Sequence, residues 1–178
     1  MKQALASLLN THGEGHPKVI ICCNNLGSAY QALGEHSKAI EYFHQAIVSG
    51  LKTYGQDHPE VALSFGNLGS AHQELGDNKE AIRYFEKALD GYVKTFGESR
   101  QKVAQYRNSL GCAYQALGQH KIAIRYLEQG LAGALKVDGG DQLGVASCHS
   151  NLGLSYHAEN DYKKAIEHYK QALIVFEE

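Results

Sequence analysis

The chain has 178 residues, 43% of them hydrophobic, and a formal net charge of −2 at pH 7. This near-neutral balance gives no electrostatic footprint for nucleic acid or for an anionic membrane, so neither is an expected partner. The longest apolar runs are far shorter than the roughly 18 residues of a transmembrane helix, so no membrane span is expected.

One motif recurs along the whole chain. Its first copy, 24–34, reads Asn-Asn-Leu-Gly-Ser-Ala-Tyr-Gln-Ala-Leu-Gly, and three more copies follow at 67–76, 109–118 and 151–160. The spacing is a constant 42 residues, as measured between the leucines Leu26, Leu68, Leu110 and Leu152. A fixed period of about 20–50 residues is the mark of a repeat array. We therefore expect a stack of repeats and not a single globule.

The chain is expected to begin inside a repeat. Residues 3–13 align with 45–55, and Met1 falls where the middle of a second helix is expected in the later copies. From this alignment we interpret 1–13 as the second half of a truncated preceding repeat. A signal peptide is the weaker interpretation, because the apolar segment is too short for one. The expected organisation is a single array over 1–178, with repeats at 14–55, 56–97, 98–139 and a C-terminally truncated 140–178.

Each repeat is expected to contain two antiparallel helices joined by a short connection. Pro17 and Pro59 suit the first turn of a first helix, where a missing N–H is no loss, and Ser99 and Asp141 are candidate N-caps. The first helices are expected to end at residues that tolerate a left-handed backbone, namely Gly34, Gly76, Gly118 and Asn160. The second helices are expected to begin near Ser37, Asn78, His120 and Asp161.

The apolar pattern explains why the repeats must stack. Each second helix carries an apolar stripe, formed in repeat 1 by Ala39, Ile40, Phe43, Ala46 and Ile47. Each first helix has a glycine in its middle, and such a glycine costs about 1 kcal/mol relative to alanine. Its recurrence predicts a close helix–helix contact at Gly27, Gly69, Gly111 and Gly153. One hairpin buries too little surface to offset its ordering entropy, whereas stacked neighbours bury enough.

This spacing resembles the tetratricopeptide repeat (TPR) pattern W-x2-L-G-x2-Y followed by A-x3-F. In repeat 1 the matching residues are Leu26, Gly27, Tyr30, Ala39 and Phe43. The chain departs from the pattern in having no tryptophan, whose place is taken by Cys23, Phe65, Arg107 and His149. It also lacks the late proline of the family.

The 42-residue period and the Gly-x-x-His-Pro motif that ends at Pro17 and Pro59 are similar to the TPRs of kinesin light chain. The motif is lost in the last two copies. The TPR resemblance implies an all-α, right-handed superhelix (solenoid) of antiparallel helix pairs. It also implies that the first helices line a concave surface.

No residue pattern predicts catalysis, a metal site or a cofactor. The four cysteines, Cys22, Cys23, Cys112 and Cys148, form no C-x-x-C motif and indicate reduced thiols in a cytoplasmic protein. The ten histidines occupy scattered repeat positions, and no nucleophile, base and orienting residue can be named together. We expect a protein that is not an enzyme.

Uncharged polar residues recur along one face of the first helices. An amide both donates and accepts hydrogen bonds, which suits the backbone of an extended peptide. By the TPR resemblance this row lines a peptide-binding groove made of Asn24, Asn25, Ser28, Gln31, Asn67, Ser70, Gln73, Asn108, Ser109, Gln115, Asn151 and His157. A solvated face without a partner is the alternative interpretation of the same row. Changing Asn25, Asn67 and Asn151 to alanine is expected to weaken partner binding and to leave the melting temperature nearly unchanged.

The expected function is protein–protein interaction in an adaptor or scaffold role, with a protein or peptide partner held in the groove. The alternative is a self-assembling spacer that makes its contacts through its ends. That alternative rests on the apolar residues expected to be uncovered at the two ends, Leu5, Leu8, Leu9, Ile166, Tyr169, Leu173 and Ile174.

Overall fold

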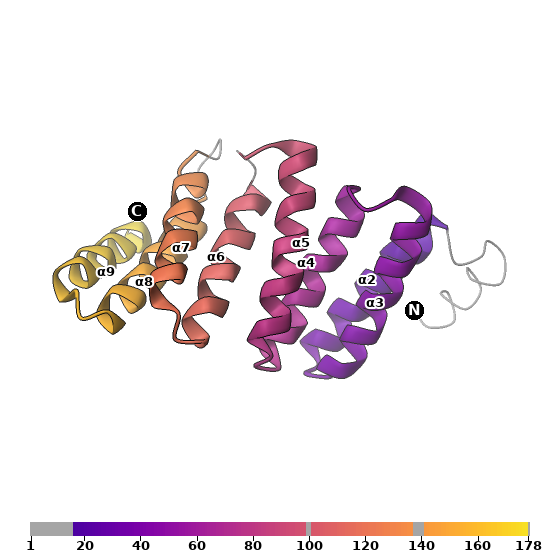
Figure 1. Ribbon diagram of the computed structural model, residues 1–178, viewed down its shortest axis with the longest axis horizontal. Coiled ribbons are helices and arrows are strands. Elements are labelled where there is room, and N and C mark those ends of the chain that lie inside the picture. Colours follow the sequence, from indigo (N-terminus) through magenta and orange to yellow (C-terminus); the bar gives the residue numbers. More distant parts are fainter. Residues whose placement is uncertain (1–15, 99–100, 137–140, 178) are drawn as a thin grey trace. The chain divides into compact units, whose positions relative to one another are not determined.

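The structure is a computed structural model that describes residues 16–98, 101–136 and 141–177, with side chains described to residue 174. The described residues form helices and no strand (Figure 1). The helices are α2 (Pro17–Ala32), α3 (His36–Tyr54), α4 (Pro59–Glu74), α5 (Asn78–Phe96), α6 (Gln101–Ala116), α7 (His120–Ala134), α8 (Gln142–Ala158) and α9 (Tyr162–Glu177). The expected all-α TPR solenoid of helix pairs is confirmed.

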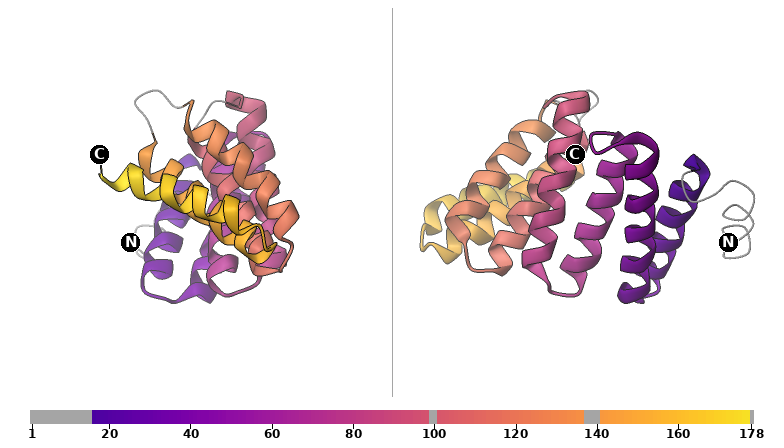
Figure 2. Two further views of the ribbon diagram at one scale, coloured as in Figure 1. Left: turned by 90° about the vertical axis from the view of Figure 1, so that its left-hand side faces the viewer. Right: turned by 45° about the vertical axis from the view of Figure 1, so that its right-hand side comes forward.

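The chain divides into two compact units, Met1–Thr95 and Phe96–Glu178. Unit 1 contains the pairs α2–α3 and α4–α5, and unit 2 contains α6–α7 and α8–α9. Inside each unit consecutive helices pack side by side, as Figures 1 and 2 show, and the two first helices also touch, α2 against α4 and α6 against α8. The single continuous array over 1–178, with its repeat boundaries, stays a prediction.

Histidine side chains cap two of the first helices. Nδ1 of His16 accepts a hydrogen bond from the backbone N–H of Lys18, and Nδ1 of His58 accepts one from Glu60, each over 3.2 Å. The proline that follows each histidine is the first residue of the helix, as expected. The Gly-x-x-His-Pro motif is therefore a helix start, in which the histidine provides the cap that sequence analysis had not assigned.

The remaining helix ends also follow the sequence. Asp141 caps α8, where its Oδ1 accepts from the N–H of Gly144 over 3.1 Å, whereas Ser99 lies outside the described residues. The four expected left-handed residues have positive φ, namely Gly34 (75°), Gly76 (81°), Gly118 (71°) and Asn160 (62°). Only glycine adopts such a φ without strain, with asparagine next, so these positions end the first helices.

A glycine faces a large side chain within every helix pair. A Cβ added to Gly27 would lie 2.4 Å from the ring of Phe43, and one added to Gly69 would lie 2.8 Å from Phe85. The same contact recurs in unit 2, at 2.5 Å for Gly111 against Leu127 and 2.5 Å for Gly153 against Tyr169. The expected close contact is confirmed. The side chain that faces the glycine is the phenylalanine of the A-x3-F element in repeats 1 and 2, and the leucine or tyrosine at that position in repeats 3 and 4.

Each helix pair also contains a stacked ring pair, which sequence analysis did not identify. One ring comes from the tyrosine position of the first helix and the other from a position 12 residues later, in the second helix. The centroid separations are 5.4 Å for Tyr30–Tyr42, 5.3 Å for His72–Tyr84, 5.5 Å for Tyr114–Tyr126 and 5.4 Å for Tyr156–His168. Such stacks are worth about 0.5–1.5 kcal/mol beyond the area they bury.

Candidate functional site

The amides on the first helices join neighbouring repeats in unit 1. Nδ2 of Asn67 on α4 donates to Oδ1 of Asn24 on α2 over 3.4 Å. Asn24 is 6% exposed, and its own Nδ2 donates to Oγ of Ser64 over 2.9 Å. Asn24 therefore lies inside the interface between α2 and α4, with both ends of its amide engaged.

Unit 2 repeats this arrangement. Nδ2 of Asn151 on α8 donates to Oδ1 of Asn108 on α6 over 3.0 Å, and it also contacts Sγ of Cys112 at 3.1 Å. Asn108 and Asn151 are both 84 residues beyond Asn24 and Asn67, so the bond is the same one two repeats later. The asparagines are thus placed by the repeat itself.

The glutamines near the ends of the first helices make a second contact of this kind. Nε2 of Gln31 donates to Oγ of Ser70 over 3.0 Å and to Oε1 of Glu74 over 2.7 Å. In unit 2, Nε2 of Gln115 donates to Oγ of Ser155 over 2.7 Å and to the backbone oxygen of Asn151 over 2.6 Å. Two independent amide contacts therefore hold α2 to α4 and α6 to α8.

The other members of the row are more open. Asn25 and Ser28 on α2 are exposed, and Gln73 and Ser109 are half-buried. His157 is exposed, with its ring edge-on to Tyr162 at 5.2 Å. The row thus divides into amides that join repeats and polar groups that face outward. Asn67 and Asn151 both donate across the interface, which argues against an unchanged melting temperature when they are replaced.

The thiols are poor nucleophiles. Burial raises the pKa of Cys23 to about 11, that of Cys112 to about 11 and that of Cys148 to about 12. The thiolate is the reactive form, so at neutral pH these side chains stay protonated. Cys112 also receives the contact from Asn151 and belongs to the α6–α8 interface.

Two histidines of repeat 4 lie against each other. Nδ1 of His149 on α8 is 2.9 Å from Nδ1 of His168 on α9, and burial lowers the pKa of both rings. Within the described residues no three His, Cys, Asp or Glu side chains are placed to hold a metal ion. The pair is therefore a neutral hydrogen-bonded contact inside a helix pair.

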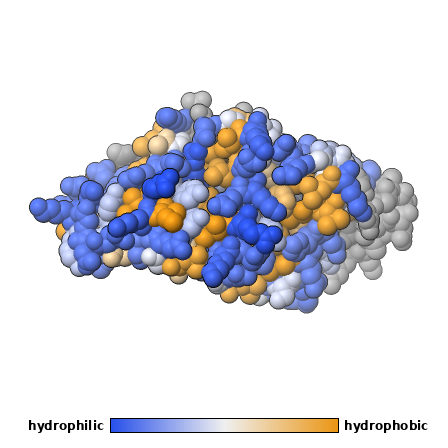
Figure 3. Space-filling model, viewed as in Figure 1, coloured by the Kyte–Doolittle hydropathy of each residue, from blue (hydrophilic) through white to orange (hydrophobic). Residues whose placement is uncertain are grey.

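Hydrophilic residues cover most of the face shown in Figure 3. On the face in Figure 3, hydrophobic residues form separate patches between them. Ion pairs such as Arg83–Glu80 join residues of one helix at exposed positions and stabilise it little. In the described part of the chain no helix is long and apolar enough to cross a membrane.

Three comparisons place the chain among known proteins. Family models described as "Tetratricopeptide repeat" match residues 24–93, 60–136 and 146–178, which together make up most of the chain. A search of curated protein sequences gave no significant match.

Several solved structures share the fold. BtubC (BKLC) from P. vanneervenii is 24% identical, with a TM-score of 0.89 over 98% of this chain and 69% of that one. A second structure contains TPR-like repeats of a putative kinesin light chain from Podosopora anserina. It is 27% identical to this chain, with a TM-score of 0.81 over 98% of this chain and 82% of that one. Aspartyl phosphate phosphatase F from Bacillus subtilis is 19% identical, with a TM-score of 0.76 over 99% of this chain and 43% of that one. The repeat motif, the helix pairs and the family matches agree, and the chain belongs to the tetratricopeptide repeat family.

Proposed function

We propose that the chain is an adaptor or scaffold that binds an extended peptide segment of a partner protein along its first helices. TPR repeats generally mediate protein–protein interaction, and the family is typically a non-enzymatic interaction module. The surface we propose contains, in each unit, the outward-facing members of the polar row, which are Asn25, Ser28 and Gln73 in unit 1 and Ser109 and His157 in unit 2. The bonded residues, Ser70 among them, border this surface.

The observation that carries this proposal is the asparagine bond that recurs in both units. An amide has two N–H groups and an oxygen with two lone pairs. Asn67 uses one N–H in its bond to Asn24, whereas Asn151 donates to Oδ1 of Asn108 and to Sγ of Cys112 and keeps its oxygen. Both asparagines are only half-buried, so their remaining capacity is open to a ligand. Because the bond between repeats already fixes each asparagine side chain, these side chains would lose little further rotamer entropy when a peptide binds.

A role without catalysis, in the cytoplasm, is part of the same proposal. The raised pKa values of Cys23, Cys112 and Cys148 leave no activated thiol among them. All four cysteines are free, which is the usual state in a reducing compartment.

Peptide display followed by fluorescence anisotropy tests the proposal. A peptide selected from a random library against the full chain should bind, and Asn25→Ala should weaken it by a few-fold, since each neutral hydrogen bond contributes about 0.5–1.5 kcal/mol. The matched control is Gln129→Ala, an exposed amide on α7, which should bind as the wild type does. Equal binding by both variants would place the peptide elsewhere.

Self-assembly is a second candidate, and the surface of α9 favours it. Ile166, Leu173 and Ile174 are 54%, 62% and 47% exposed. Tyr169 was also expected to be uncovered, but it is half-buried and its ring packs against Gly153. Leu5, Leu8 and Leu9 lie outside the described residues. The corresponding residues of α7, Ile124 and Leu131, pack instead against buried clusters that include Val145 and Leu152 of α8. An uncovered apolar stripe of this kind suits contact with another helix, such as one from a second copy of the chain.

A further inference from the structure

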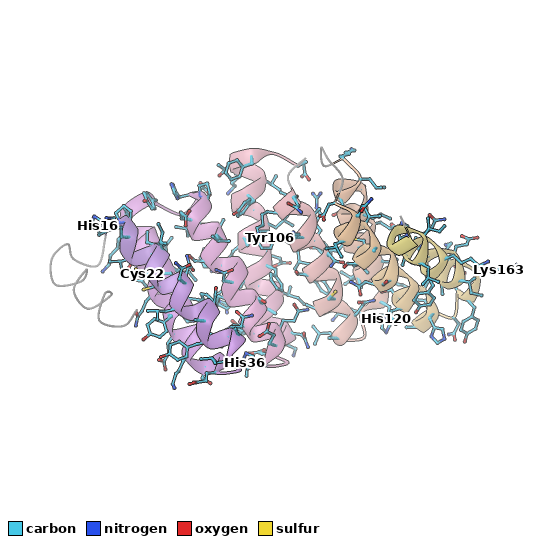
Figure 4. All side chains as sticks on the ribbon, turned by 180° about the vertical axis from the view of Figure 1, so that it is seen from behind. His16, Cys22, His36, Tyr106, His120 and Lys163 are labelled. Atoms are coloured by element: carbon cyan, nitrogen blue, oxygen red, sulfur yellow. The ribbon has the colours of Figure 1, made fainter. Side chains whose placement is uncertain are left out.

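The first helices of unit 1 carry an apolar pair beside the polar row. Ile21 on α2 is 49% exposed, and Leu63 on α4 is half-buried. The two residues are 42 positions apart, so they occupy the same place in successive repeats. Figure 4 labels Cys22, the residue that follows Ile21 on α2. Sequence analysis followed only the polar residues of these helices and did not identify the pair.

The fold itself does not require apolar side chains at this place. The same position is Gln105 in repeat 3 and Ser147 in repeat 4, and both of these residues are exposed. A polar residue therefore serves the repeat equally well, and Ile21 and Leu63 remain open to solvent although both are large and apolar. Single exposed apolar residues are ordinary, whereas two at one repeated position of neighbouring helices indicate an interaction site.

Packing brings the pair together. The bonds Asn24–Ser64 and Gln31–Ser70 join residues 40 and 39 positions apart, so α2 and α4 run in the same direction and nearly in register. The two helices touch, and packed helices lie about 8–10 Å apart. Equivalent residues on them are separated by about this distance, so one side chain placed between Ile21 and Leu63 can contact both.

The pair lies one helical turn from the asparagines of the proposed peptide site. Asn25 follows Ile21 by four residues, and Asn67 follows Leu63 by four. On each helix the apolar side chain and the amide therefore share one face and lie about 6 Å apart along the axis. An extended chain advances about 3.3 Å per residue, so a segment bonded to the amides places a side chain at the apolar pair about two residues away.

The surroundings of the pair favour an uncharged side chain. Lys18 and Glu60, three residues before Ile21 and Leu63, occupy equivalent positions and carry opposite charges. The neighbourhood therefore has no net charge that would attract an ionised group. A charged side chain placed between two aliphatic residues would lose water without gaining a partner, whereas an aliphatic one is stabilised by leaving water.

We propose that Ile21 and Leu63 hold one aliphatic side chain of the partner segment, of about the size of leucine, while Asn25 and Asn67 bond to the backbone of that segment. The apolar pair then determines which segments bind, because amides that recognise only backbone accept many sequences. The inference rests on the proposed function, since the aliphatic side chain is supplied by the bound peptide.

A double-mutant cycle tests the contact. The probe is a peptide selected by display against the full chain, with each of its residues changed in turn to alanine and affinities measured by fluorescence anisotropy. The key variants are Ile21→Gln and Leu63→Ser, which copy repeats 3 and 4. Ile21 is largely exposed, so the first variant retains the fold. The matched control is Leu33→Gln, which changes an aliphatic residue that is 72% exposed at the far end of α2.

We expect one aliphatic residue of the peptide to weaken binding at least about tenfold when it becomes alanine, as the loss of a buried leucine would. Ile21→Gln and Leu63→Ser should each weaken the parent peptide at least about fivefold and the alanine peptide less than about twofold, because the contact is already lost there. Leu33→Gln should stay within about twofold of the wild type for both peptides. Additive losses, or a peptide without an essential aliphatic residue, would overturn the proposal.

Methyl NMR on the full chain decides the matter if the library yields no binder. The probes are N-acetyl-leucine N-methylamide and its glutamine and lysine analogues. The leucine probe should shift the methyl signals of Ile21 and Leu63 in a saturable way and more tightly than the other two. In that case no saturable shift, or a preference for the lysine probe, would contradict the inference.

The two proposals fail separately. If selected peptides bind and respond to Asn25→Ala, but do not respond to Ile21→Gln or Leu63→Ser, the apolar contact is wrong and the peptide-binding function stands. If no peptide binds and the leucine probe shifts the two methyl signals as described, the apolar site stands and the peptide-binding function is wrong.

Discussion

The asparagines of the first helices have two tasks, and substitution separates them. We expect Asn67→Ala to lower the free energy of unfolding by about 0.5–1.5 kcal/mol, because it removes the bond to Asn24. Asn151→Ala should do the same in unit 2. Asn25→Ala should change stability by less than about 0.5 kcal/mol, since Asn25 is exposed. Urea titrations measure all three, and equal stability of the three variants would contradict a structural role for the bonded amides.

The mid-helix glycine of repeat 2 gives a larger effect. Gly69→Leu places a side chain where even a Cβ would be 2.8 Å from Phe85. We expect a loss of about 1–3 kcal/mol or more, the usual cost of overpacking a core. Ala32→Leu adds the same side chain at an exposed position near the end of α2 and is the control. If thermal denaturation gives both variants the same drop in melting temperature, the close contact at Gly69 does not contribute to stability.

At the scale of the helix pair, repeat 4 differs from the others in the chemistry of its stacked rings. His168 takes the position of Tyr42, Tyr84 and Tyr126, and its Nδ1 lies against that of His149. Burial lowers the pKa of His149, with His168 as the second cause. The pKa of His168 is also lowered, by burial first, while Glu128 on α7 and Glu167 oppose the shift and Lys164 adds to it.

The sign of the pH dependence follows from these shifts. The ordinary histidine pKa is 6.5 and the folded values are lower, so in the window below 6.5 the unfolded chain binds more protons. Stability therefore falls as the pH drops through 6.5 towards the folded pKa values. We expect α8 and α9 to lose hydrogen-exchange protection first when the pH is lowered from 7 to 5.

A double variant tests this assignment. His149→Phe with His168→Tyr copies Phe65 and Tyr84, the ring pair at the same positions of repeat 2. It should reduce the loss of stability between pH 7 and 5, as measured by urea titration at each pH. His157→Gln installs the glutamine of the other repeats and controls for the loss of one histidine outside the pair. If the control and the double variant reduce the pH dependence equally, the pair is not its source.

At the scale of the whole molecule, we predict that the exposed apolar stripe of α9 joins copies of the chain. Ile166, Leu173 and Ile174 would bury apolar area worth about 25 cal/mol per Å². We expect the sedimentation coefficient to rise with concentration, and Leu173→Glu to abolish the rise by placing a charge in the contact. Val48→Glu changes an exposed apolar residue of α3 in unit 1 and is the matched control. A wild type that stays monomeric at high concentration would remove the self-assembly candidate.

Much of the fold could be predicted from the sequence, because local chemistry decides it. The 42-residue period could be read directly. The left-handed residues that end the first helices, such as Gly34 and Asn160, and the prolines that start two of them follow from the backbone geometry that single residues favour. The close contact at Gly27 and Gly69 could be predicted as well, since glycine in a helix is costly unless another group needs the space. The TPR family follows from the same spacing.

The candidate site could be predicted only as a row of polar residues on one face. Asn24 and Asn25 are consecutive residues of one helix, so the sequence treats them alike. Packing alone decides that Asn24 is 6% exposed while the side chain of Asn25 is exposed to solvent. A hydrogen bond between residues 43 positions apart, such as Asn67 to Asn24, depends on how two helices approach. The cap at Asp141 is a second example. The sequence predicts the N-cap, whereas only the tertiary structure shows that Oδ2 of Asp141 is buried without a hydrogen-bond donor among the described residues.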